Sequence, residues 1–596
     1  MKEKAKKNHG SAFERGGEED YSLFFDEDEQ YARGSAGSSA SAAGSSSAAH
    51  YYWVSAQRHR RALFFNSLLV LVVLLLIVLF VLFAVYDHQS SVRRAPLVVH
   101  TEYGAVHGFY AAANNSRVFL GVPFAAPPVG ALRWKSPHPP SKWQGVRNAT
   151  AYGPVCPQVL ESPILIQDFP VSEDCLYLNV FTPKEPADHK LPVMLWIYGG
   201  GFDSGSANLY DGTALAAEDT IVVTFNYRLG PFGFLALPEL KHENMSMPTG
   251  FYGIEDQRAA MQWVKNNIAA FGGDPERITI FGESAGAIST CIHMVANKSA
   301  DLFQQALMQS GFCNVFPISE AYVMGAQFKH SLNCNTLSCL RNKTIKEVMD
   351  AVASASLSFT FWPVLDPAEL SQQPNISIQQ GKLHSSIEAF LIGTTNEENA
   401  WWLCSTYADM TEDQYRDALL EQGLASSAVD EVMQLYPVEA YDHPVQALIA
   451  ATSDGSFKCP SLEVAVSTSR ISSSVSSIAE RTWMYSFDII SGLSLKLGQC
   501  YKAAHSMEIF FLFPKILHFV TIPYTMSHAE HELSSFMIRS WTNFAKNGDP
   551  NSSTFGTKWP TFHSENNYIR LNKTLTVETE FRSPNCEFWN AYGPLN

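Results

Sequence analysis

The chain has 596 residues, of which 46% are hydrophobic and 17% charged, and its formal net charge is −16. This composition is ordinary for a globular protein. The negative charge argues against a nucleic-acid-binding protein, because phosphate binding requires clustered Lys and Arg.

The N-terminal region divides into a polar tail and one apolar segment. Residues 1–57 contain a stretch of only Gly, Ser and Ala at Gly34–Ala49, which cannot bury a core and predicts a disordered cytosolic tail. Ala62–Tyr86 carries no charged side chain. A helix of this length crosses a bilayer, so residues 62–86 are predicted to form one transmembrane signal-anchor helix.

The orientation of this helix follows from basic residues and glycosylation sequons. Arg58, Arg60 and Arg61 lie directly before the segment, whereas Arg93 and Arg94 lie farther beyond it, so the N-terminus is expected in the cytosol. All Asn-X-Ser/Thr sequons follow the segment. The sequence therefore predicts a single-pass type II membrane protein with an extracellular or lumenal body, glycosylated at Asn114, Asn148, Asn244, Asn297, Asn342, Asn375, Asn551 and Asn572.

All ten cysteines also follow the apolar segment and are expected in an oxidising compartment. No Cys-x-x-Cys pair occurs, so disulfides are predicted and a zinc site is not.

Strand-like and helical segments alternate along residues 97–596, with no second linker or internal repeat. This alternation predicts one α/β domain with a mainly parallel sheet and an active site at the carboxyl ends of its strands. The expected strands are Leu191–Ile197, Ile221–Phe225, Arg277–Phe281, Ala389–Ile392 and Trp483–Phe487, and the expected helices include Ile254–Asn267 and Ala287–Ala296.

A Gly-x-Ser-x-Gly motif, Gly282–Gly286, stands between an expected strand and an expected helix. This context is typical of a nucleophile elbow, a sharp turn that presents a serine above the sheet. Ser284 is the candidate nucleophile, placed at a helix N-terminus that favours developing negative charge.

A second glycine motif, Gly199-Gly-Gly-Phe202, closes the strand that ends near Tyr198. Consecutive glycines allow backbone N–H groups to face a ligand. The N–H groups of Gly200, Gly201 and Ala285 are therefore the candidate oxyanion hole.

Spacing alone leaves the acid and the base of a catalytic triad open. In α/β-hydrolases the chain order is Ser, then Asp or Glu, then His. Glu397 and Glu398 follow one expected strand and His505 follows a later one, but Asp366 and His528 remain rivals.

Residues 97–596 resemble the type-B carboxylesterase family, which includes the cholinesterases. The matching stretches run in family order: Glu173–Asn179 (EDCLYLN), Trp196–Phe202 (WIYGGGF), Asn226–Gly230 (NYRLG), Asp256–Arg258 (DQR), Phe271–Pro275 (FGGDP) and Phe281–Gly286 (FGESAG). The resemblance implies an α/β-hydrolase fold and a serine carboxylic-ester hydrolase that needs no metal or organic cofactor.

The resemblance also implies roles for individual residues. Gly393–Glu398 aligns Glu398 with the family's acid, and the His-x-x-Glu segment His505–Glu508 aligns His505 with its base. The implied disulfides are Cys156–Cys175, Cys334–Cys339 and Cys459–Cys586, which leaves the pairing of Cys291, Cys313, Cys404 and Cys500 open.

Two departures from the cholinesterases concern specificity. The 156–175 loop contains no Trp, and Leu165 occupies the place of the residue that holds choline, so choline esters are disfavoured. Leu357 and Phe359 are expected on the acyl side and Trp401 and Trp402 in an apolar pocket wall. Small uncharged esters with short-to-medium acyl chains are the predicted substrates.

The alternative function is a cell-surface adhesion or receptor protein, since related ectodomains with decayed triads serve that purpose. All three triad residues are present here, which favours hydrolysis. The membrane contact is expected through the one helix, and a homodimer or a surface protein partner is left open.

Overall fold

The computed structural model describes residues 47–92, 96–111, 116–158, 168–183, 187–471, 477–563, 565–593 and 595. The chain divides into two compact units, Met1–His88 and Gln89–Asn596. Of the predicted tail, residues 1–46 lie outside the described part.

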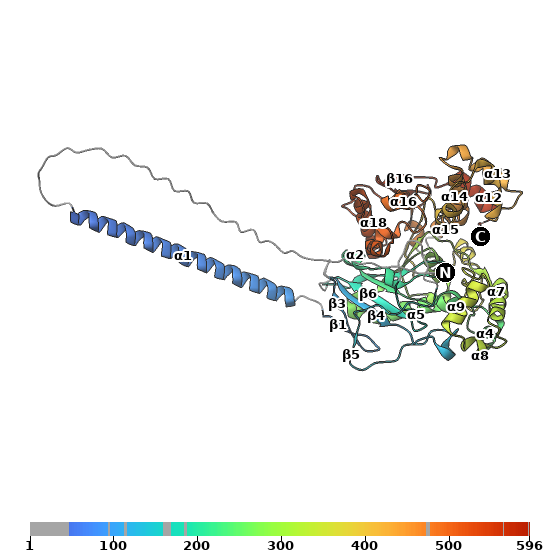
Figure 1. The fold of residues 1–596 in the computed structure, drawn as a ribbon, viewed down its shortest axis with the longest axis horizontal. Coiled ribbons are helices and arrows are strands. Elements are labelled where there is room, and N and C mark those ends of the chain that lie inside the picture. Colours follow the sequence, from blue (N-terminus) through green and yellow to red (C-terminus); the bar gives the residue numbers. More distant parts are fainter. Residues whose placement is uncertain are drawn as a thin grey trace, which may run out of the picture. The chain divides into compact units, whose positions relative to one another are not determined.

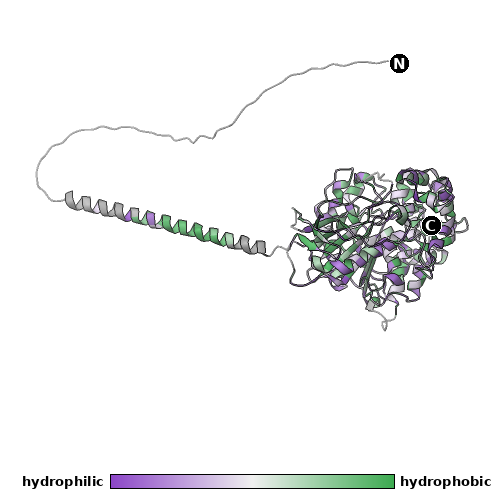
Figure 2. Cartoon of the chain, turned by 90° about the horizontal axis from the view of Figure 1, so that it is seen from below, coloured by the Kyte–Doolittle hydropathy of each residue, from purple (hydrophilic) through white to green (hydrophobic). Residues whose placement is uncertain are grey.

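The described part of the first unit belongs to one long helix, α1 (Ser47–Val92). No Gly or Pro occurs within these residues, while Gly44 precedes them and Pro96 follows, which explains the helix length. The helix therefore includes residues 47–57, which were expected in a disordered tail. Within it, Leu63–Ala84 is long and apolar enough to span a membrane, and Figure 2 shows the hydrophobic middle of the helix.

An 11-stranded sheet forms the centre of the second unit (Figure 1). Its strand order is β16-β15-β14-β13-β10-β9-β7-β8-β6-β4-β3. The bounds are β3 Phe109–Tyr110, β4 Arg117–Pro123, β6 Tyr177–Thr182, β7 Leu191–Ile197, β8 Ile221–Phe225, β9 Gly273–Glu283, β10 Gln305–Gln309, β13 Ala389–Thr395, β14 Thr482–Phe487, β15 Tyr568–Leu571 and β16 Thr576–Glu578.

The central strands β8, β7, β9, β10, β13, β14 and β15 are parallel, and antiparallel strands flank them at both edges. The mainly parallel sheet is thus confirmed, and β7 and β8 have their predicted bounds. β9 begins at Gly273, earlier than the predicted start at Arg277. The sequence did not reveal its first half, which is polar and only partly buried, because the apolar run marks only the buried second half.

Every residue of β7, β8, β10 and β13 is buried. Helices therefore cover both faces of the sheet, as expected for parallel strands. Those that pack on it include α2 Thr213–Ala216, α5 Tyr252–Asn267, α6 Ala285–Val295, α15 Cys459–Ser469 and α18 His528–Asn547.

The remaining elements lie in the connections. Figure 1 shows that α7–α9 and α12–α14 form two peripheral groups of helices. Their bounds, with the other small elements, are β1 Val98–His100, β2 Ala105–His107, β5 Val146–Asn148, α3 Gly230–Phe234, α4 Pro238–Glu243, β11 Phe316–Pro317, α7 Ile318–Ser331, α8 Leu337–Arg341, α9 Ile345–Ser354, β12 Val364–Leu365, α10 Pro374–Gln379, α11 Ala400–Tyr407, α12 Tyr415–Glu421, α13 Val429–Leu435, α14 Pro444–Ser453, α16 Gly492–Leu497, α17 Ile509–Leu512 and α19 Ser583–Tyr592.

All ten cysteines form disulfides. The three pairs implied by the family resemblance are present, and the four remaining cysteines form two further pairs. The bonds are Cys156–Cys175, Cys291–Cys313, Cys334–Cys339, Cys404–Cys500 and Cys459–Cys586.

The predicted glycosylation sites differ in exposure. Asn148, Asn244, Asn297 and Asn342 are exposed, Asn375, Asn551 and Asn572 are half-buried, and Asn114 lies outside the described residues. The Nδ2 group of Asn551 donates hydrogen bonds to Asp549 and to the Trp559 carbonyl, and a glycan at this position would remove at least one of these donors.

Candidate active site

Ser284 occupies a strained turn between β9 and α6. Its backbone angles are φ 57° and ψ −124°. Residues other than glycine rarely adopt this conformation, which costs about 1–3 kcal/mol. The Ser284 N–H donates to the Gln309 carbonyl at 2.9 Å, which helps to hold this conformation. The half-buried Ser284 is thus presented at the carboxyl end of β9.

The turn brings the backbone of α6 against β7 and leaves no space for side chains at the flanking glycines. A Cβ atom on Gly286 would lie 1.9 Å from the Ile197 carbonyl oxygen, and one on Gly282 would lie 2.5 Å from the Gly286 backbone. These close approaches explain why both positions of the motif are glycine.

The glycine loop after β7 lies next to this turn. A Cβ atom on Gly199 would be 2.8 Å from the Ser284 Cβ atom. Gly200 and Gly201 have φ angles of 114° and 61°, and within the described residues their N–H groups donate no hydrogen bond. The N–H of Ala285, the first residue of α6, has no acceptor within its helix. These three donors are available to a developing negative charge.

His505 and Glu398 form a short hydrogen bond. Glu398 follows β13, and its Oε1 accepts from the Thr395 N–H at 2.7 Å. Its Oε2 lies 2.5 Å from Nδ1 of His505. A carboxylate only accepts, so Nδ1 carries the proton and Nε2 is left as the base position of neutral imidazole.

The rival acids and base have other partners. The neighbouring Glu397 accepts from the Ala503 N–H at 3.0 Å, and Asp366 pairs with Lys241 at 2.8 Å. His528 is exposed and lies 3.5 Å from Glu532. Of the candidates left open by the sequence, Glu398 and His505 are the pair that meets.

Nε2 of His505 points toward the residue that precedes Ser284. It lies 3.1 Å from Oε1 of Glu283 and makes no hydrogen bond to the Ser284 hydroxyl. Hydrogen bonds of this kind are often long in unliganded enzymes and shorten when substrate binds. The Ser506 hydroxyl also donates to Glu283 and ties this carboxylate to the histidine segment.

Three buried carboxyl groups surround the imidazole and alter its titration. Burial alone lowers the pKa of His505, but attraction to Glu283 and Glu398 outweighs it and raises the pKa to about 9. Burial and repulsion from Glu283 and Glu398 raise the pKa of Glu508 to about 8. Burial also raises the pKa of Glu283, against the attraction of His505.

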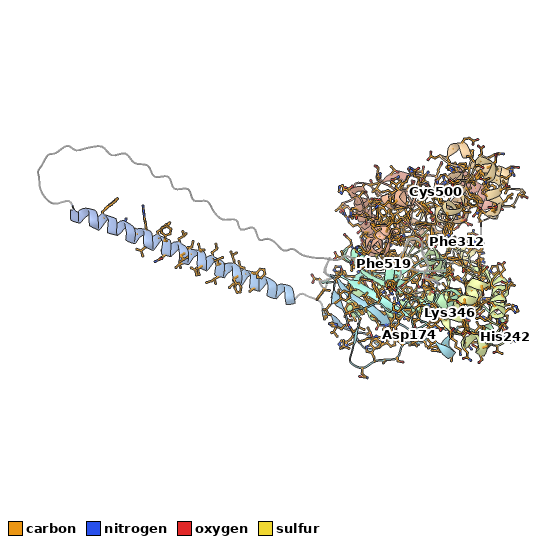
Figure 3. The ribbon with its side chains drawn as sticks, viewed as in Figure 1. Asp174, His242, Phe312, Lys346, Cys500 and Phe519 are labelled. Carbon is orange, nitrogen blue, oxygen red and sulfur yellow. A yellow bond between two sulfur atoms is a disulfide. The ribbon has the colours of Figure 1, made fainter. Side chains whose placement is uncertain are left out.

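A cavity of about 1000 Å³ lies near His505, although neither His505 nor Ser284 lines it. Trp402 and Phe457 line it and also contact the His505 ring, with ring centroids 5.4 and 4.9 Å away. Phe312, labelled in Figure 3, Phe359 and Trp362 add further aromatic wall. Among the described residues that line the cavity, Glu320 is the one with a charged side chain, so the cavity suits an apolar group.

Two of the four predicted pocket residues, Phe359 and Trp402, line this cavity, whereas Leu357 and Trp401 do not. Leu357 is buried in the connection after α9, which ends at Ser354, and the Trp401 indole donates to the His505 carbonyl at 2.5 Å. Neighbouring positions on a helix face different directions, which a linear motif does not resolve. Leu165, the basis for disfavouring choline, lies outside the described residues.

Sequence reasoning missed the contacts of Glu283 and Phe457 with His505. Glu283 stands inside the elbow motif, so its position next to the candidate nucleophile Ser284 was a usable signal. Phe457 lies in a π-helical turn, Asp454–Lys458, and such turns are frequent at functional sites but leave no sequence pattern. No cluster of three or more His, Cys, Asp or Glu suited to a metal occurs in the described part of the chain.

Residues 95–589 match the Carboxylesterase family. The chain belongs to this family. It is 35% identical to the para-nitrobenzyl esterase of Bacillus subtilis over 504 residues, covering 81% of this chain and 96% of the relative. It is 33% identical to the cholinesterase of Mus musculus, covering 87% and 90% of the two chains, and 33% identical to a medium-chain fatty acyl-CoA hydrolase precursor of Anas platyrhynchos, covering 82% and 91%.

Solved structures of esterases are also similar to this chain. Two structures of a PNB esterase superpose with TM-scores of 0.70 and 0.71 at 33% and 34% identity, and both comparisons cover 83% of this chain. The second unit therefore has the α/β-hydrolase fold that the sequence predicted. This carboxylesterase is an enzyme that hydrolyses carboxylic esters.

Proposed function

We propose that this carboxylesterase acts through a Ser284–His505–Glu398 triad and an acyl-enzyme intermediate. The observation that carries the proposal is the 2.5 Å hydrogen bond from His505 Nδ1 to Glu398. Glu398 follows the carboxyl end of β13, and the strained Ser284 follows the carboxyl end of β9 in the same parallel part of the sheet. A histidine oriented by a buried carboxylate beside a serine turn is the arrangement that activates a hydroxyl nucleophile.

The three side chains have different roles in the proposed reaction. His505 Nε2 takes the proton of the Ser284 hydroxyl as its oxygen attacks the ester carbonyl, and returns that proton to the leaving alcohol. Glu398 stabilises the imidazolium. Water then attacks the acyl-enzyme while His505 again takes a proton; as the bond between the acyl carbon and Ser284 Oγ breaks, His505 returns this proton to Oγ and the carboxylic acid is released. These steps use no cofactor.

The tetrahedral intermediate places a negative charge on the former carbonyl oxygen. We assign this oxyanion to the N–H groups of Gly200, Gly201 and Ala285. One such donor stabilises the transition state by about 3–4 kcal/mol, so the unused N–H groups of the loop make a large contribution.

The preferred substrates are small uncharged esters with short-to-medium acyl chains. The cavity near His505 supports this proposal because more than half of its lining residues are apolar and its volume exceeds what an acetyl group requires. Butyryl esters are therefore expected to react faster than acetyl esters.

We further propose that α1 anchors the enzyme as a type II membrane protein with residues 97–596 on the extracellular or lumenal side. The support is the apolar stretch Leu63–Ala84, the basic residues before it, and the position of every sequon after it.

One labelling experiment tests these proposals together. The full chain, in sealed microsomes, is titrated with a membrane-impermeant fluorophosphonate while p-nitrophenyl acetate and butyrate hydrolysis is followed. After permeabilisation, both activities should fall to zero at one equivalent, with the adduct on the Ser284 peptide. A fluorophosphonate adduct on a residue other than Ser284 would contradict the triad. Labelling of vesicles that were not permeabilised would contradict the topology. Hydrolysis of p-nitrophenyl acetate at the same rate as the butyrate, or faster, would contradict the acyl preference.

The pH profile should report the carboxylates around His505. The base must be neutral, so kcat/KM is expected to rise with pH and to reach half its maximum near the pKa of His505, about 9. Glu283→Gln removes one attraction that favours the imidazolium and should shift the half-maximum to lower pH. Kinetics over roughly pH 6–10 measure this.

Glu255→Gln is the matched control, because Glu255 is also buried but bonds to Ser136. Its profile should follow that of the wild type. A Glu283→Gln profile that does not move would show that Glu283 has no influence on the base.

A further inference from the structure

The loop that carries His505 lacks regular secondary structure. Between α16, which ends at Leu497, and α17, which begins at Ile509, the chain forms only turns and one isolated bridge, Glu397 with Ala504. No strand ladder or helix holds the imidazole. Its position therefore depends on contacts with neighbouring segments.

The segment after Glu398 supplies several of these contacts. The Glu397 N–H donates to the Ala503 carbonyl at 3.0 Å, and Trp401 donates from its indole to the His505 carbonyl. Trp401 also packs on Tyr501, with ring centroids 5.1 Å apart. The segment that carries Glu398 and the segment that carries His505 are thus joined by hydrogen bonds and by one contact between aromatic rings.

A disulfide also links these two segments. Cys404 lies in α11, shortly after Glu398, and Cys500, labelled in Figure 3, shortly precedes His505; their sequence separation is 96. Gln446 of α14 donates to the Cys500 carbonyl at 3.1 Å and fixes that end. The hydrogen bonds of this region can exchange with water, whereas the covalent bond cannot.

We propose that the Cys404–Cys500 disulfide is a positioning element that keeps His505 within hydrogen-bonding distance of Glu398. The inference rests on the proposed triad. The disulfide is a covalent link between two segments 96 residues apart in sequence, so it limits how far they can separate in the folded protein. Misplacement of a catalytic group by about 1 Å costs about 100-fold in rate, so loss of this restraint should act on kcat.

The Cys334–Cys339 bond provides a matched control. It includes a half-buried cysteine, Cys339, as the Cys404–Cys500 bond includes half-buried Cys500. It closes a loop with a separation of only 5 residues beside α8, away from the segments that carry Glu398 and His505. Loss of this bond should therefore leave catalysis unchanged.

The test compares two double variants of the full chain, Cys404→Ser/Cys500→Ser and Cys334→Ser/Cys339→Ser. The first should lose about tenfold to 100-fold in kcat for p-nitrophenyl butyrate with an unchanged KM. The half-maximum of its pH profile should move to lower pH, because Glu398 then stabilises the imidazolium less. The second should match the wild type in all three measurements.

A chemical arm avoids any failure of the variant to fold. Dithiothreitol is applied to folded wild type until mass spectrometry finds Cys404 and Cys500 reduced; each sulfur gains a hydrogen as the reagent's two thiols are oxidised to its cyclic disulfide. The Cys334→Ser/Cys339→Ser variant is treated in parallel. Both should lose kcat to the same extent while circular dichroism stays unchanged.

The outcomes separate this inference from the proposed function. If untreated wild type is not labelled by fluorophosphonate at Ser284, the triad is wrong and the inference falls with it. If it is labelled, but kcat survives cleavage of Cys404–Cys500 or falls only together with the circular dichroism signal, the positioning role alone is overturned.

Discussion

Ser284→Ala is expected to lower kcat for p-nitrophenyl butyrate by about 10⁴-fold to 10⁶-fold. Alanine removes the hydroxyl that forms the acyl-enzyme, and the remaining donors at Gly200, Gly201 and Ala285 only stabilise a water-derived intermediate. KM should change little, because the cavity walls are not altered. Steady-state kinetics with a melting curve measure both effects, and the melting temperature should not decrease, since alanine adopts the strained backbone no less easily than serine.

Ser456→Ala provides the control, since Ser456 lines the cavity near His505 but has no place in the proposed triad. It should retain kcat within about threefold, in line with a substitution away from the reacting atoms. Substantial turnover by Ser284→Ala, with the protein folded, would require a different nucleophile.

Glu398→Gln is expected to lower kcat by about 10³-fold to 10⁴-fold. The amide keeps the size of the side chain and an oxygen for the Thr395 N–H, but it removes the negative charge that stabilises the imidazolium. An amide NH₂ directed at Nδ1 also favours the tautomer with the proton on Nε2, which cannot accept the serine proton. The measurement is kcat together with the rate of fluorophosphonate labelling, and both should fall.

The adjacent Glu397→Gln is a stringent comparison because the two residues are neighbours in sequence. Glutamine at this position can still accept from the Ala503 N–H through its side-chain oxygen. The variant should therefore lose no more than about tenfold in kcat. A larger loss in Glu397→Gln than in Glu398→Gln would reverse the assignment of the acid.

The electrostatics of the site explain why these carboxylates differ in effect. Glu398 contacts Nδ1, where it is expected to stabilise the charged imidazole throughout the proposed reaction, whereas Glu283 approaches Nε2, the atom that must be free to take a proton in that reaction. Glu283 is therefore expected to favour a protonated resting histidine. Both carboxylates raise the pKa of His505, so Glu283 together with Glu398 is expected to determine the pH at which the proposed reaction proceeds.

The sequence by itself determined the features that depend on local backbone sterics. Gly282 and Gly286 are necessary because a Cβ atom at either position would collide with backbone atoms, and the apolar runs at Leu191–Ile197 and Ile221–Phe225 marked two central strands without error. The family motifs extended this to the fold and to ester hydrolysis, since they occur in order along the whole domain.

Only the tertiary structure decided which distant groups meet. It paired Cys291 with Cys313 and Cys404 with Cys500, and it placed Phe457 against the imidazole, whereas Trp401 bonds to the His505 carbonyl and does not line the cavity. The contact between Glu398 and His505, which the family motifs implied, could not be derived from spacing alone. The physical reason is that a side chain's direction changes from one residue to the next, and contacts between remote segments depend on how helices and loops pack on the sheet. Local sequence patterns predict the turn that presents Ser284, but tertiary packing decides which side chains from distant segments lie near it.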